Sequence, residues 1–171
     1  MRANRFWVSF VVPVAFFGAV LTFASCAVIR ERMHSTVSTP AYLPPINAGA
    51  ENVVLNSVNG LRGVHHMRRL AISGNLTQKA RYWARWMALG NCGRAVICHS
   101  SLTGGINVRW SWLAENVGAA TPQSNVMGVV NGFRNSPLHA ANILSPRAQY
   151  VGVGVAYAGN TVYVVEEFMQ T

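Results

Sequence analysis

Residues 150–168 read YVGVGVAYAGNTVYVVEEF, and they predict a β-hairpin near the C-terminus. Valine alternates with glycine over residues 151–155, which is the two-residue period of an extended strand. Gly159-Asn160 supplies a tight turn. The second strand is apolar on both faces at residues 162–165, which indicates that other elements cover both sides of the sheet.

Three amphipathic segments precede the hairpin and predict helices. Residues 51–64 carry apolar side chains at helical spacing, with a stop at Gly63. Residues 77–90 begin at Thr77, a good N-cap, and end at Gly90. Residues 124–135 begin with Ser124 as N-cap, after which a proline redirects the chain into a short helical turn that runs to Leu144.

The segment between the second and third helices is irregular. Residues 91–111 are rich in glycine, and Trp110 and Trp112 flank Ser111 with an alternation typical of a short strand. Helices come early, the hairpin comes late, and the sheet is covered on both faces. This order predicts an α/β fold, a three-layer α-β-α sandwich with a central, mainly antiparallel sheet and a C-terminal hairpin.

The N-terminus has the layout of a signal peptide over residues 1–26. Arg2 and Arg5 precede an apolar run over residues 6–23, and small residues follow. Three interpretations remain open. The first is a lipoprotein in which Cys26 is acylated, the second is simple secretion, and the third is an uncleaved membrane anchor. All three place the rest of the chain outside the cytoplasm, either secreted or tethered to the membrane.

Residues 27–50 contain three prolines with several Ser and Thr and predict a flexible linker, which leaves residues 51–171 as one domain. The formal net charge is +9. Removal of Arg2 and Arg5 leaves 12 basic and 5 acidic residues, a net +7. No nucleic-acid module is present, so we expect no nucleic-acid partner. Anionic phospholipid and wall polymers are the expected partners of a basic exported protein.

Two cysteines follow the predicted signal peptide. Cys92 and Cys98 would oxidise to a disulfide outside the cytoplasm. The small loop that they close would contribute about 2 kcal/mol to stability. Because Cys98 precedes His99, the disulfide would also hold the loop that presents this imidazole.

His99, Glu115 and His139 are the candidate site residues. The chain has no Asp and only five Glu, so a carboxylate between two histidines stands out. Two imidazoles and one carboxylate suit a divalent metal such as zinc, which would activate a water for hydrolysis. The alternative is structural, in which the three side chains bond to one another and pin loops to the sheet.

Glu166 and Glu167 lie late in the final strand. Adjacent strand residues point to opposite faces, so the two carboxyls cannot both enter one site. The interpretations are a strand-end charge or a pair with an arginine.

From Val53 to Met169 the chain resembles the CAP superfamily of cysteine-rich secretory proteins, antigen-five-type allergens and plant pathogenesis-related proteins of the first class, and it is most similar to the short bacterial members. The resemblance rests on LNSVNGLR (55–62), HSSL (99–102), WLAENVG (112–118), NSPLH with NIL (135–139 and 142–144) and VGVGV (151–155).

This resemblance implies an α-β-α sandwich with an open cleft, which in many members holds two His and two acidic residues and takes a divalent metal. His99 matches the first cleft histidine, Glu115 the glutamate of the Glu-Asn motif, and His139 the imidazole of the Ser-Pro-Gly-His motif. The chain departs from the pattern twice: Leu138 replaces the glycine of that motif, and Tyr150 lies where the remaining cleft histidine falls.

These observations predict an exported SCP-domain protein that acts as a binding module at the bacterial cell surface. Its N-terminus would contact the membrane, and its ligand would be a lipid, a sterol-like molecule or a wall polymer. One alternative is a metal-dependent hydrolase, although the chain has neither Gly-x-Ser-x-Gly nor His-Glu-x-x-His. The other is a structural or interaction protein with a non-catalytic cleft.

Overall fold

The computed structural model describes residues 46–94 and 96–171. The predicted signal peptide, Cys26 and most of the predicted linker lie outside this part of the chain. In the described part, no helix is long and apolar enough to cross a membrane.

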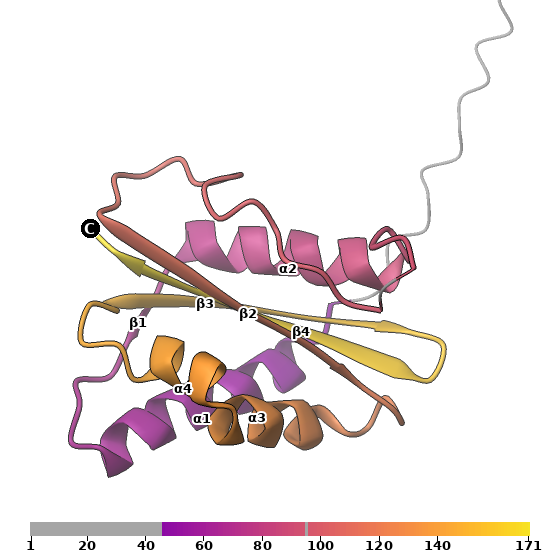
Figure 1. Cartoon of the computed structure of the whole chain (residues 1–171), viewed down its shortest axis with the longest axis horizontal. Coiled ribbons are helices and arrows are strands. Elements are labelled where there is room, and N and C mark those ends of the chain that lie inside the picture. Colours follow the sequence, from indigo (N-terminus) through magenta and orange to yellow (C-terminus); the bar gives the residue numbers. More distant parts are fainter. Residues whose placement is uncertain (1–45, 95) are drawn as a thin grey trace, which may run out of the picture. The chain divides into compact units, whose positions relative to one another are not determined.

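Four helices and a four-stranded sheet make up the described part. In chain order they are α1 (Ala48–Val64), β1 (Ala71–Ile72), α2 (Gly74–Ala88), β2 (Trp112–Ala120), α3 (Val126–Asn135), α4 (Pro137–Ile143), β3 (Tyr150–Ala158) and β4 (Thr161–Gln170). The strand order is β1-β3-β4-β2. Helix α2 covers one face of the sheet, and α1, α3 and α4 cover the other (Figure 1). The predicted α-β-α sandwich is therefore confirmed.

The sheet is mixed rather than purely antiparallel. Strands β3 and β4 form the predicted hairpin, and β2 adds antiparallel to β4 as an edge strand. The short β1 pairs parallel to β3 on the opposite edge. Strand β2 is longer than the short strand expected near Trp112, because its polar and small residues are held by pairing with β4 over the whole length of β2.

Side-chain caps decide where the helices begin. Asn47 accepts a hydrogen bond from the Ala50 amide (3.0 Å), so α1 starts three residues before the predicted position. Ser73, not Thr77, caps α2. Asn125 caps α3 in place of Ser124. Each prediction missed its boundary because a second good capping residue lay nearby in the sequence.

The valine–glycine alternation of β3 makes its two faces unequal. Val151, Val153 and Val155 pack into the core under α1 and α3. On the other face, Gly152 and Gly154 let α2 approach closely. A Cβ atom at either glycine would lie 2.2 Å from the α2 backbone, at Leu76 and Ala80 respectively. The glycines therefore set the distance between α2 and the sheet.

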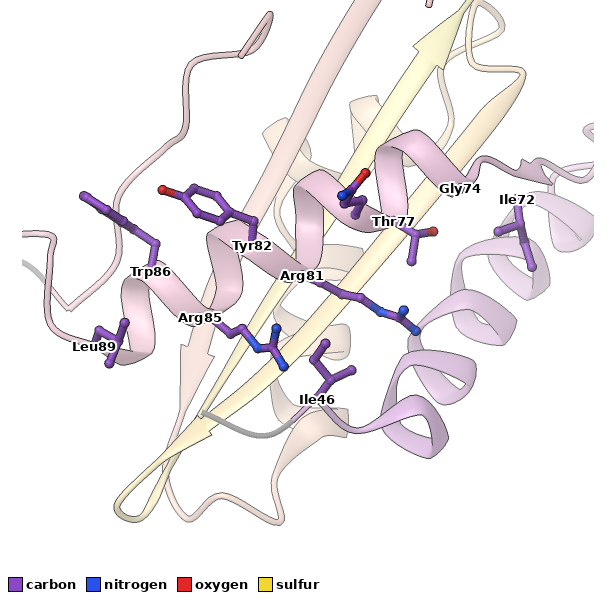
Figure 2. A pocket seen from close by; sticks show the side chains of 10 residues that line it. Ile46, Ile72, Gly74, Thr77, Arg81, Tyr82, Arg85, Trp86 and Leu89 are labelled. Atoms are coloured by element: carbon purple, nitrogen blue, oxygen red, sulfur yellow. The ribbon is translucent and has the colours of Figure 1, made fainter. Parts of the chain in front are cut away.

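The outward side of α2 is exposed and partly apolar. Tyr82, Trp86 and Leu89 are 59%, 36% and 44% exposed. Together with Ile46 and Arg85, they line a surface hollow of about 640 Å³ (Figure 2).

Candidate functional site

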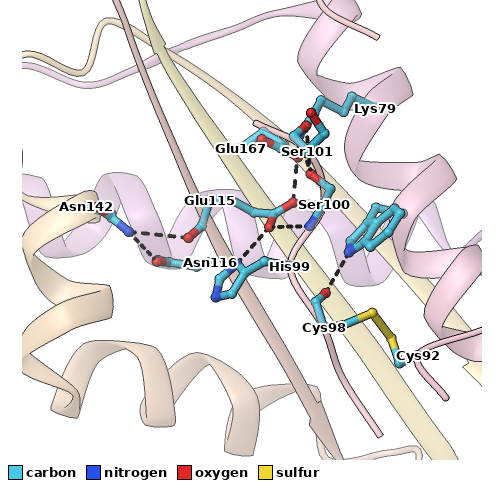
Figure 3. A network of polar contacts seen from close by, with 11 residues as sticks. Lys79, Cys92, Cys98, His99, Ser100, Ser101, Glu115, Asn116, Asn142 and Glu167 are labelled. Atoms are coloured by element: carbon cyan, nitrogen blue, oxygen red, sulfur yellow. Dashed lines mark hydrogen bonds and ion pairs between the residues drawn. A yellow bond between two sulfur atoms is a disulfide. The ribbon is translucent and has the colours of Figure 1, made fainter. Parts of the chain in front are cut away.

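A row of side chains crosses the sheet on the face toward α2. Glu115 of β2 lies opposite Glu167 of β4, and Glu167 lies opposite Gly152 of β3. Lys79 of α2 reaches into this row (Figure 3). Its ammonium forms an ion pair with Glu167 Oε1 and lies 3.7 Å from Glu115 Oε2. The single lysine of the chain thus lies between two buried carboxyls.

Lys79 also links the row to the segment after α2. Its Nζ donates a hydrogen bond to Ser100 Oγ at 2.6 Å. The Lys79 and Glu167 side chains are 4% and 1% exposed, so the charges interact through a medium of low polarity. Burial raises the pKa of Glu167 to about 8, and the Lys79 ammonium opposes this shift.

Glu115 is held at its other oxygen by the segment that carries His99. His99 Nδ1 lies 2.7 Å from Glu115 Oε1, and the Ser100 amide donates to the same oxygen at 2.9 Å. Burial alone would raise the pKa of Glu115, but contacts with Ser100, Glu167 and His99 bring it below its ordinary value. The predicted contact between His99 and Glu115 is therefore present.

The next row of the sheet lies on the opposite face. Asn116 Nδ2 donates to Glu166 Oε2 (2.9 Å) and to the His139 carbonyl (3.2 Å). Asn142 Nδ2 donates to Asn116 Oδ1 (2.9 Å) and to the Glu115 carbonyl (3.3 Å). These bonds fasten α4 to the edge strand β2.

Glu166 and Glu167 point to opposite faces, as the strand period requires. Neither is the expected strand-end charge, because both are buried. Glu167 pairs with a lysine rather than with an arginine. Burial raises the pKa of Glu166 to about 8, although its bond with Asn116 acts in the other direction.

His139 lies on α4 beside β2. Its ring packs against Phe133 at 4.9 Å between centroids, and its Nδ1 is buried without a hydrogen-bond partner among the described residues. Burial lowers the pKa of His139, and the nearby His99 lowers it further, so both effects favour the neutral imidazole. The segments that bear His99, Glu115 and His139 thus meet at the edge of the sheet.

The predicted disulfide between Cys92 and Cys98 is confirmed, with the two Cα atoms 5.6 Å apart. Trp83 of α2 adds a second restraint, because its Nε1 donates to the Cys98 carbonyl at 2.7 Å. Together they fix the chain immediately before His99.

A metal ion does not fit this donor set. Within residues 46–94 and 96–171, no three His, Cys, Asp or Glu side chains are grouped so as to hold one. The Lys79 ammonium beside Glu115 would also repel a divalent cation bound by that carboxylate. The structure therefore joins His99 to Glu115 and does not add His139 as a third ligand.

The sequence analysis assigned no role to two residues of the site, Lys79 and Ser100, and it did not predict that Glu167 pairs with a lysine. A signal for Lys79 was present. It lies within the buried stripe of α2, three residues after Leu76 and next to Ala80. A lysine in that stripe needs a buried anion, and few carboxylates exist in the chain to supply one.

Residues 55–168, more than half of the chain, match the model of the cysteine-rich secretory protein family. The chain belongs to the CAP family. No curated protein sequence matches it. The match begins within α1 and ends in β4, so it contains the whole candidate site of this CAP domain.

Solved structures share the fold at low sequence identity. An extracellular SCP-domain protein of Bacillus anthracis is 21% identical with a TM-score of 0.56, over 72% of this chain and 41% of that one. An outer surface protein of Borrelia burgdorferi is 14% identical with a TM-score of 0.60, over 75% of this chain and 98% of that one. NaASP2, solved with Zn²⁺, is 13% identical with a TM-score of 0.53, over 72% of this chain and 80% of that one.

At these identities the likeness shows the fold alone. This CAP domain also spans less than half of the Bacillus protein.

Proposed function

We propose that this CAP-domain protein is an exported binding module of the bacterial cell envelope, and that its ligand is a lipid or wall polymer with repeated negative charge. The observation that carries the proposal is the placement of charge. All four described glutamates are buried: Glu51, Glu115, Glu166 and Glu167. Eight arginines are exposed or half-exposed: Arg68, Arg69, Arg81, Arg85, Arg94, Arg109, Arg134 and Arg147.

This arrangement leaves no exposed side-chain carboxylate among the described residues, although the buried Glu51 pairs with Arg81. Ten basic residues against four acidic ones leave the described part at +6. Such a surface attracts polyanions and accelerates their encounter. The relatives described as extracellular or outer-surface proteins support a place in the envelope.

The polar network around Glu115 has a structural role in this proposal. Glu115 is bound through one oxygen by His99 and Ser100, and Lys79 faces the other. A carboxylate held as an anion in this way is a poor proton acceptor for a reaction. No contact among the described residues favours the hydrolase alternative. The hydrogen bonds of the network hold the segment that carries His99 against strand β2.

Attachment to the membrane through Cys26 is part of the same proposal. It rests on the Phe23-Ala24-Ser25-Cys26 sequence after the apolar run. Intact mass spectrometry of the protein taken from its native membrane should show a diacylglycerol on an N-terminal Cys26. A mass that corresponds to a chain starting at Met1 would indicate an uncleaved membrane anchor instead of the lipoprotein. A mass that corresponds to an unlipidated chain starting at a later residue would indicate simple secretion.

The binding proposal is tested with the full chain in nanodiscs of phosphatidylcholine, which is neutral. The probes are phosphatidylglycerol vesicles, teichoic acid and peptide-free peptidoglycan strands, with phosphatidylcholine vesicles and chitin oligosaccharides as neutral controls. We expect at least one anionic probe to bind and its affinity to fall steeply between about 0.05 and 0.5 M salt. Equal binding of neutral and anionic probes, or binding of none, would contradict the proposal.

A further inference from the structure

A surface hollow of about 530 Å³ lies at the end of the sheet where β1 and β3 begin. One wall is the end of α1 with the segment that leads to β1, and the other is the connection from α4 to β3 (Figure 1). The two walls are joined by a hydrogen bond of 3.0 Å from the Ala71 amide to the Gln149 carbonyl. The hollow is therefore at the opposite edge of the sheet from β2, which carries Glu115.

Three arginines line this hollow, namely Arg62, Arg68 and Arg69. Arg68 and Arg69 are exposed, and neither guanidinium has a hydrogen-bond or ion-pair partner among the described residues. None of the four described glutamates lines the hollow. In the described part of the chain, the hollow therefore presents positive charge that no side-chain anion neutralises.

Arg62 is the buried member of this set, with 2% of its surface exposed. Its Nε donates to the Arg68 carbonyl at 2.7 Å, and its Nη1 donates to the Ile143 and Ser145 carbonyls at 2.8 and 3.0 Å. These partners are neutral, and Nη2 makes no hydrogen bond within residues 46–94 and 96–171. Burial lowers the pKa of Arg62, and no carboxylate opposes this shift. A buried cation without an anion costs free energy, and an anion in the hollow would reduce that cost.

Neutral donors lie beside the arginines. The Tyr150 hydroxyl has no hydrogen-bond partner in the described part of the chain, and Tyr150 lines the hollow from the start of β3. The Gln149 amide oxygen accepts a hydrogen bond from the Thr171 amide at 3.2 Å, so its amide nitrogen is left as a donor. Tyr150 is one of the two departures from the CAP sequence pattern, and this departure places a hydroxyl donor among the arginines.

We propose that this hollow binds a phosphodiester group, and that this group belongs to the envelope ligand of the proposed function, on which the inference rests. Guanidinium groups bind phosphate oxygens through paired N–H donors, and these charge-assisted hydrogen bonds are strong. Arg68 and Arg69 bind the charged oxygens, and the Tyr150 hydroxyl donates a further hydrogen bond. Teichoic acids and phospholipid headgroups share this phosphodiester chemistry.

The arrangement of the donors favours a phosphodiester over a lone carboxylate. A carboxylate is planar, and one guanidinium fork can satisfy both of its oxygens. A phosphodiester has tetrahedral oxygens that can be reached from several directions. Here the donors come from both walls, with Arg68 and Arg69 on one and Tyr150 on the other. The volume of the hollow also lies within the range of about 300–1,000 Å³ that is usual for ligand pockets.

The test uses the full chain in dodecyl maltoside micelles, because phosphatidylcholine would itself supply phosphodiesters. The probes are glycerol teichoic acid, mixed micelles that contain phosphatidylglycerol, and peptide-free peptidoglycan strands, whose charges are carboxylates. Titration calorimetry gives the Kd of each probe. Arg134→Gln is the matched control for Arg68→Gln and Arg69→Gln, because Arg134 is an exposed arginine of α3 that does not line the hollow. Equal thermal midpoints establish that the variants are folded.

We expect Arg68→Gln and Arg69→Gln each to raise the Kd for the phosphate probes by about tenfold, and Arg134→Gln to change it by less than about twofold. Tyr150→Phe removes a donor but no charge. It should raise the Kd by about threefold and leave the salt dependence of binding unchanged, whereas the two arginine variants should weaken that dependence. Binding of teichoic acid alone would identify a wall polymer as the source of the phosphodiester, and binding of phosphatidylglycerol alone would identify a lipid.

Three outcomes would overturn the inference. If the phosphate probes bind but the hollow variants behave like Arg134→Gln, the hollow is not the site, while the envelope function stands. If peptidoglycan strands bind as tightly as the phosphate probes and lose affinity in the same variants, the phosphodiester assignment is wrong. If no anionic probe binds the wild type, the proposed function falls together with the inference.

Discussion

Glu166 and Glu167 are neighbours in β4 with opposite surroundings. Glu167 faces the ammonium of Lys79, whereas Glu166 has a neutral partner, Asn116, on the other face of the sheet. An anion at Glu166 has no described cation to offset its loss of hydration, and burial raises the pKa of this carboxyl to about 8. Burial raises the pKa of Glu167 to about 8 as well, although the Lys79 ammonium acts in the other direction. The proton on Glu166 is therefore part of the folded structure at neutral pH.

The Glu166→Gln variant tests whether folded Glu166 is protonated at neutral pH. Between the ordinary pKa of 4.5 and about 8, folded Glu166 keeps a proton that the unfolded chain releases, so stability falls as pH rises through this window. The amide does not titrate. The variant should match the wild type near pH 4.5 and exceed it by on the order of 2–4 kcal/mol at pH 8.

The measurement is urea unfolding at several pH values. Glu115→Gln is the matched comparison with the opposite sign, because the pKa of Glu115 lies below its ordinary value. The Glu115 carboxylate adds stability above the ordinary pKa of a glutamate, and this contribution is lost as the pH falls. The Glu115→Gln variant should therefore have a lower free energy of unfolding than the wild type at neutral pH. A Glu166→Gln variant without any pH-dependent gain would contradict a neutral Glu166.

Helix α2 is the element on which the site depends. It carries Lys79 and Trp83, and it contacts β3 and β4 across the glycine face of the sheet. If α2 moved outward, Lys79 would lose its contacts with Glu115 and Glu167, and the buried Glu115 carboxylate would lose the ammonium beside it. Gly152 and Gly154 therefore position the polar network as well as the packing.

Gly154→Ala should show this dependence. Its Cβ would meet the α2 backbone at 2.2 Å, and backbone atoms cannot rotate away as a side chain does. We expect a loss of about 3 kcal/mol or more in the free energy of unfolding. Gly60→Ala is the control, since Gly60 lies in α1 with open space around it and should gain about 0.5–1 kcal/mol. Denaturant titration measures both, and a Gly154→Ala loss below about 1 kcal/mol would contradict tight packing of α2.

Across the described molecule, charge is sorted by depth. The four described glutamates are buried and are held by Lys79 and by hydrogen bonds. Most of the described arginines are exposed or half-exposed, and their like charges repel one another. Arg62 is the buried exception among the arginines. It donates to the carbonyls of Arg68, Ile143 and Ser145 and so ties α1 to the end of α4.

This sorting predicts that salt stabilises the protein. Added salt screens repulsion among the exposed arginines, while the buried Lys79–Glu167 pair is largely shielded from it. The thermal midpoint in sodium chloride should rise by a few degrees between about 0.02 and 0.3 M, at constant pH. A midpoint that falls over this range would show that exposed ion pairs outweigh the repulsion.

Local pattern was enough to predict the hairpin, the helices and the order of the layers. The alternation of valine with glycine over residues 151–155 is a property of neighbouring residues, and so is the Cys92–Cys98 link. Helix starts were missed by a few residues, because Asn47, Ser73 and Asn125 compete with their neighbours as caps and the folded context selects among them.

What the amino-acid sequence determined by itself was the sandwich fold, since hydrophobic periodicity is a local signal. It singled out His99 and Glu115 as site residues through the resemblance to the CAP superfamily, whereas their direct contact is a feature of the folded structure. The tertiary structure alone decided that Lys79 would be the cation of the site and that Glu166 and Glu167 would be buried. Those partners are separated by up to 88 residues. Only the register of β2 against β4 and the close approach of α2 bring them together, and burial then fixes their charges.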